Sequence, residues 1–165
     1  MSPTASHVAS MYLQGTYKPD GDAPAQGEWD RTGEDPKWRQ GHHELVVAAV
    51  NSWKGDPVEM VLHARDEREG APQPGSGSGR QKRAQAAALL YEMKHNSKVS
   101  RKPLYRGLHI KPQGEQSWST FRKVAELWAG KNHGQVFELP AGTRGLQVSD
   151  YIGSPDPEKE WIVKT

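Results

Sequence analysis

Apolar residues recur at helical spacing in three segments that follow residue 40. Residues 42–55 carry such a stripe, and Gly55 is suited to end a helix there. Residues 56–69 begin with Asp56 as a candidate N-cap and Pro57 at the first helical position. Residues 80–97 are rich in alanine, the best helix former. Three helices are therefore predicted in this part of the chain.

The segments around these helices have the composition of loops. Residues 1–40 are rich in Gly, Pro, Asp and Ser and show little apolar periodicity, so they are predicted to be mostly irregular, with Trp29 and Trp38 as candidate anchors. Residues 70–80 read as a flexible loop. Because neither side of that loop holds many apolar residues, a single domain is predicted over residues 41–165.

The periodicity changes to that of strands near residue 102. In residues 102–111, Leu104, Arg106 and Leu108 alternate with Tyr105 and Gly107. Residues 117–131 begin polar and become helical, with an expected apolar stripe at Val124, Leu127 and Trp128. Three short strand patterns follow at residues 134–140, 145–152 and 159–165. Helices followed by short strands indicate an α+β fold.

Composition narrows the class of protein. The 165 residues carry 22 basic and 20 acidic side chains, a near balance that argues against nucleic-acid binding as a main role. No cysteine is present, so disulfides and thiolate metal sites are excluded. The N-terminus lacks a signal-peptide pattern, and no apolar stretch reaches the length of a membrane span. We therefore expect a soluble, cytoplasmic protein without a membrane partner.

Two polar clusters carry little chemical signal. His42, His43 and Glu44 are adjacent in sequence and lack HExxH spacing, so no metal is expected. The basic residues Arg80, Lys82 and Arg83 fit a solvated helix face, with an anionic partner as the alternative.

Two later patterns give a stronger indication of a functional site. Arg106 falls on the inner side of an otherwise apolar strand, which is costly unless its guanidinium meets an anion. Gly107 would let a ligand approach the backbone closely. Glu158 and Glu160 would share one face of a strand, which is unfavourable unless they face solvent or a cation.

In this order, the strand arginine, the segment "SWSTFRKVAELWA" and the pair Glu158–Glu160 resemble the arginine, Ser-Thr-Ser and Glu-x-Glu motifs of mono-ADP-ribosyltransferases. The resemblance is to the toxin-like and phage-encoded branch and covers roughly Lys102 to Thr165. It implies an ADP-ribosyltransferase-like core of two small packed β-sheets. It also implies NAD as a substrate and no metal. For a phage-encoded protein, the compartment would be the host cytoplasm.

The resemblance assigns roles to individual residues. Arg106 would hold the NAD phosphates and ribose, the Gly107 backbone would hold the nicotinamide amide, and Tyr105 is the aromatic residue before the arginine. Ser119 would position the catalytic glutamate, and Thr120 would support the strand. The third motif position is Phe121 rather than serine, and its ring is a candidate to stack on nicotinamide. An alternative register takes Ser117 as the first serine.

The glutamates and the loop before them complete the implied site. Glu160 would stabilise positive charge on the ribose, and Glu158 would accept a hydrogen bond or proton from the nucleophile. Glutamate at position 158 implies an arginine acceptor presented by another protein, with Tyr151 as the candidate target contact. The alternatives are an NAD glycohydrolase on the same fold and a non-catalytic, phage-associated binding protein.

Overall fold

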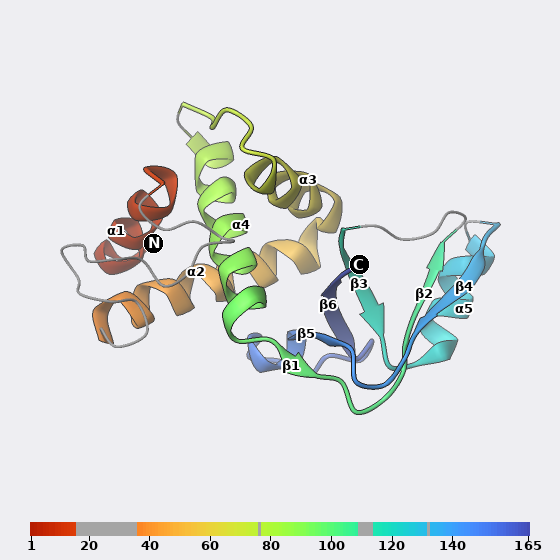
Figure 1. Cartoon of the computed structure of the whole chain (residues 1–165). Coiled ribbons are helices and arrows are strands. Elements are labelled where there is room, and N and C mark those ends of the chain that lie inside the picture. Colours follow the sequence, from red (N-terminus) through yellow and green to blue (C-terminus); the bar gives the residue numbers. More distant parts are fainter. Residues whose placement is uncertain (16–35, 76, 109–113, 132) are drawn as a thin grey trace. The chain divides into compact units, whose positions relative to one another are not determined.

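The computed structural model describes residues 1–15, 36–75, 77–108, 114–131 and 133–165. The chain forms two compact units, Met1–His95 and Asn96–Thr165, coloured red to green and green to blue in Figure 1. The first unit is helical, and the second combines a sheet with a helix. The predicted α+β class is therefore confirmed.

The first unit contains four helices in its described residues. They are α1 (Pro3–Leu13), α2 (Pro36–Gly55), α3 (Pro57–Arg68) and α4 (Gly77–His95). Helix α4 contacts each of the other three, and its residues from Arg83 to Glu92 are all buried. The alanine-rich helix is thus the centre of this unit, because small side chains let its neighbours pack closely. Since α4 begins at Gly77, the predicted loop 70–80 is shorter than expected.

Helix α1 lies within residues 1–40, the segment that was predicted to be mostly irregular. The hydroxyl of Ser2 caps it by accepting a hydrogen bond from the amide of Ala5, and Pro3 occupies the first turn. Its inner face buries Val8 and Tyr12. Trp38 is also buried, whereas Trp29 lies outside the described residues. The Ser-Pro start was the sequence signal for this helix.

The division into units differs from the single domain predicted over residues 41–165. The boundary lies at His95–Asn96, and each side has its own core. In the second unit the core contains Leu104, Trp118, Trp161 and Val163. Alanine supplies much of the core of the first unit, and a count of large apolar residues undervalues it.

The second unit contains one antiparallel sheet of six strands. The strands are β1 (Lys98–Val99), β2 (Leu104–Leu108), β3 (Glu115–Ser119), β4 (Gln135–Leu139), β5 (Arg144–Gln147) and β6 (Glu160–Lys164). Their order across the sheet is β1-β5-β6-β3-β2-β4. Helix α5 (Arg122–Lys131) follows β3, and the short 3-10 helix η1 (Val148–Asp150) follows β5. The three strands that carry the candidate motifs, β6, β3 and β2, are consecutive neighbours.

In the part of the chain that the structure describes, strand pairing links all six strands into one sheet, in place of the predicted two packed sheets. The link is narrow. Among the described residues, β2 and β3 are paired only between Tyr105 and Ser119, whereas β2 pairs with β4 over five positions. Figure 1 shows β2 and β3 meeting at one end and diverging from there. The sheet therefore has two well-paired parts joined at a single position.

Helix α5 packs on β2 through small residues rather than through the predicted stripe. A Cβ at Gly107 would lie 2.0 Å from the carbonyl oxygen of Ala125 and 2.4 Å from the amide nitrogen of Ala129. Ala125 and Ala129 are buried, while Leu127 and Trp128 are exposed. The close approach of helix and strand backbones selects small residues on both, which apolar periodicity alone does not reveal.

Candidate functional site

Arg106 lies on β2 where this strand begins to diverge from β3. Its Nη1 donates a 2.6 Å hydrogen bond to the backbone carbonyl of Ser117 on β3. Its Nε is buried and has no hydrogen-bond partner among the described residues. An unpaired buried donor is costly, so this guanidinium is suited to an additional acceptor such as a phosphate or carboxylate.

Burial also affects the charge of Arg106. Desolvation lowers the pKa of its guanidinium from the ordinary value, and the nearby charge of Glu160 opposes that shift. Arginine remains a cation despite such a shift, because its ordinary pKa lies far above neutrality. The site therefore pairs a half-buried cation with a buried carboxylate.

Glu160 opens β6 and is buried, with 7% of its surface exposed. The hydroxyl of Ser117 donates a 2.5 Å hydrogen bond to its Oε2. Ser117 thus contacts both charged residues, Arg106 through its carbonyl and Glu160 through its hydroxyl. The alternative register, with Ser117 as the first serine of the motif, matches this geometry.

Ser119 has a different contact from the one implied for it. Its hydroxyl donates a 2.5 Å hydrogen bond to the backbone carbonyl of Glu158 and accepts one from the amide of Phe121. The Thr120 amide donates to the carbonyl of Lys159 at 3.3 Å. The end of β3 is therefore attached to the backbone of the Glu158–Glu160 segment.

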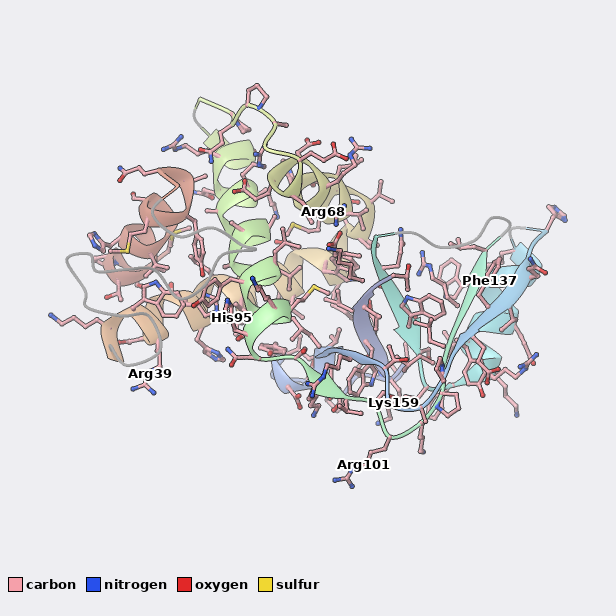
Figure 2. All side chains as sticks on the ribbon, viewed as in Figure 1. Arg39, Arg68, His95, Arg101, Phe137 and Lys159 are labelled. Atoms are coloured by element: carbon pink, nitrogen blue, oxygen red, sulfur yellow. The ribbon has the colours of Figure 1, made fainter. Side chains whose placement is uncertain are left out.

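The two glutamates are not two residues of one regular strand. Glu158 lies in an exposed turn, Lys159 has a positive φ of 49°, and the strand begins at Glu160. Lys159 is labelled in Figure 2, at the end of the sheet where β6 starts. The alternation expected from a strand does not apply here, so the turn sets the orientation of Glu158.

Tyr105 and Gly107 lie on the face of β2 that α5 covers. The guanidinium of Arg122, at the start of α5, lies 5.5 Å from the centre of the Tyr105 ring. The α5 backbone lies so close to position 107 that a side chain would not fit there. This contact explains the glycine without a ligand. Since neighbouring strand residues point to opposite faces, the structure does not bring Tyr105 together with Arg106.

Phe121 and Tyr151 both have partly accessible side chains. Phe121 precedes α5 and is 44% exposed, so part of its side chain is open to contact. Tyr151 follows η1 and is half-buried in the segment that leads from β5 to β6.

Asp156 is the residue that sequence reasoning missed. It is 2% exposed, and its carboxylate accepts hydrogen bonds from the amides of Glu158 and Glu160. The signal was the Pro-Asp-Pro sequence, since aspartate commonly bonds the backbone two residues further on.

Comparison with known proteins gives no further guide, since no protein-family model, curated protein or solved structure matches this chain. Within the described residues, no group of three or more His, Asp or Glu residues is arranged to hold a metal ion. No helix in that part of the chain is both long and apolar enough to cross a membrane.

Proposed function

We propose that the Asn96–Thr165 unit carries the site of an NAD-dependent mono-ADP-ribosyltransferase that modifies arginine on an acceptor protein. The main support is the chain of contacts from Arg106 through Ser117 to Glu160, across the neighbouring strands β2, β3 and β6. A dinucleotide needs a cation for its phosphates and a carboxylate for its reacting ribose. These two groups contact the same serine, Ser117, and the proposal has one NAD molecule bind to both.

The proposed binding step uses Arg106. Its Nε, which lacks an acceptor among the described residues, would donate to an NAD phosphate oxygen. Arginine is suited to this role because its planar fork can give two parallel hydrogen bonds to one phosphate. Phe121, whose ring is partly exposed, remains the proposed contact for nicotinamide.

The proposed chemical step breaks the bond between ribose C1′ and the nicotinamide nitrogen. The electron pair leaves on nicotinamide, and positive charge develops on the ribose. The Glu160 carboxylate would accept a hydrogen bond from the ribose 2′-hydroxyl and stabilise that charge, while Ser117 holds its other side. A carboxylate fixed before the reaction needs little reorganisation when the charge appears.

The proposed transfer step uses Glu158. A nitrogen of the acceptor guanidinium forms the new bond to C1′, and its proton passes to the Glu158 carboxylate. Glu158 is exposed, so it could meet an acceptor protein. A guanidinium also complements two neighbouring carboxylates in charge. The cytoplasm is the proposed compartment because the reaction consumes NAD.

Glu158→Gln tests the division of roles between the glutamates. We expect transfer to the guanidine agmatine to fall by at least about 100-fold, since a general base is lost, while nicotinamide release into water continues. Nicotinamide release by the wild type without any transfer would indicate an NAD glycohydrolase. Unchanged transfer by Glu158→Gln would disprove the role given to Glu158.

A further inference from the structure

Asp156 accepts hydrogen bonds from the backbone amides of the Glu158–Glu160 segment. Its Oδ2 accepts from the Glu160 amide at 2.6 Å, and its Oδ1 accepts from the Glu158 amide at 3.3 Å. Its backbone carbonyl accepts from the Lys159 amide at 3.2 Å. All three backbone amides of the segment therefore donate hydrogen bonds to Asp156, a residue that is 2% exposed.

Backbone carbonyls of the same segment accept hydrogen bonds from residues at the end of β3. The Glu158 carbonyl accepts from the Ser119 hydroxyl, and the Lys159 carbonyl accepts from the Thr120 amide. Together with Asp156, these contacts fix the backbone of both glutamates from two directions.

The backbone between the glutamates is in a conformation that needs such support. Lys159 has a φ of 49°, in the left-handed region that a residue with a Cβ disfavours. Without external hydrogen bonds, the segment would relax towards an extended strand, and such a change at Lys159 would turn the Glu158 side chain relative to Glu160.

We propose that Asp156 is a positioning residue, whose buried carboxylate sets the relative orientation of Glu158 and Glu160 through their backbone amides. This inference rests on the proposed function, because the orientation matters only if both carboxylates act on one substrate. Ser117 would then fix the Glu160 side chain, and Asp156 its main chain. Effective catalysis requires this kind of support behind the reacting groups.

The test compares Asp156→Asn with Asp66→Asn, which removes the same charge from the surface of α3 in the first unit. An asparagine side chain has one acceptor oxygen in place of two, so it can serve only one of the two amides well. Amide hydrogen exchange should become at least about tenfold faster at Glu158 or Glu160 in Asp156→Asn, the size expected for a lost charge-assisted hydrogen bond. Exchange in α5 and in the paired strands β2 and β4 should stay unchanged, which shows that the unit carrying Asp156 is folded.

Steady-state NAD cleavage separates positioning from plain stability. We expect Asp156→Asn to lower kcat by about 100-fold with KM for NAD changed by less than about threefold, because the reacting geometry is lost while Arg106 is intact. Asp66→Asn should match the wild type. If Asp156→Asn does not fold, Asp156→Ser keeps one acceptor oxygen and is measured instead, with Asp66→Ser as its control.

The outcomes separate this inference from the proposed function. A wild-type protein that cleaves no NAD refutes the proposed function and the inference with it. An active wild type in which Asp156→Asn keeps its kcat refutes the inference alone. Unchanged exchange at both glutamate amides also refutes it, because the contact would then not hold the turn.

Discussion

The hydroxyl of Ser117 on β3 donates a 2.5 Å hydrogen bond to the carboxylate of Glu160 on β6. The two residues are diagonal neighbours, since Ser117 is paired with Ile162 and Glu160 with Ser119. The backbone of the same serine accepts the hydrogen bond of Arg106. Ser117 therefore joins the two charged groups of the candidate site.

Ser117→Ala should lower the rate of NAD cleavage by about 10- to 100-fold, because a hydrogen bond to a charged group contributes about 1.5–3 kcal/mol. The melting temperature should fall as well, because the folded protein also loses its hydrogen bond to the buried Glu160 carboxylate, so rates are measured well below it. Ser10→Ala, on the exposed side of α1, is the matched control. A Ser117→Ala enzyme with wild-type kcat would show that this hydroxyl does not support Glu160 in the reaction.

Arg106→Lys should raise the Kd for NAD by at least about tenfold, because a lysine cannot reproduce the two parallel hydrogen bonds of a guanidinium. Isothermal titration calorimetry with NAD measures this directly. Arg101→Lys, on an exposed position of the same unit, should leave the Kd unchanged. Equal affinities of Arg106→Lys and the wild type would remove Arg106 from the binding site.

Gly107→Ala should destabilise the second unit by about 3 kcal/mol or more, because its Cβ would overlap the backbone of α5 and overpacking forces the helix to move. Gly130→Ala on α5 meets no atom within 4 Å and should instead stabilise by up to about 1 kcal/mol through helix propensity. Urea unfolding of both variants measures the difference. A Gly107→Ala protein as stable as the wild type would contradict the observed helix–strand contact.

Glu44 makes the helical unit sensitive to acid. The hydroxyl and amide of Ser2 donate to its carboxylate, and these hydrogen bonds hold the pKa of Glu44 below its ordinary value of 4.5. A depressed pKa in the folded state means that the stabilisation is complete above the unfolded-state pKa and is lost as pH falls through the folded-state pKa. Thermal unfolding between pH 7 and pH 3 should therefore show a smaller loss of stability in Glu44→Gln than in the wild type. Equal losses in both proteins would exclude this contribution.

Local patterns predicted several elements because the residues that define them are neighbours in the chain. Strand β2 follows from the alternation around Arg106, and helix α3 follows from Asp56 and Pro57. The exposure of Leu127 and Trp128 could not be predicted, because the inner face of α5 is determined by the backbone approach at Gly107. That contact joins residues far apart in the sequence.

The contacts within the site were harder to predict from the sequence for a related reason. Ser117 and Ser119 share one strand face, so alternation cannot tell which of them meets Glu160. The answer depends on the register of β3 against β6. The turn at Glu158 departs from a strand because Asp156 binds the amides of Glu158 and Glu160, a local contact that the Pro-Asp-Pro sequence indicates and that strand alternation does not.

The most direct measurement of the central claim compares the wild type with Glu160→Gln in a reaction with NAD labelled in its adenylate part. Free nicotinamide and label on the proteins of a bacterial lysate are both recorded, and circular dichroism shows that each protein is folded. We predict nicotinamide release and protein labelling by the wild type, and a loss of both by at least about 100-fold in Glu160→Gln, because charge on the ribose is no longer stabilised. A folded wild type that neither binds NAD nor releases nicotinamide, or a Glu160→Gln variant with wild-type rates, would contradict the account.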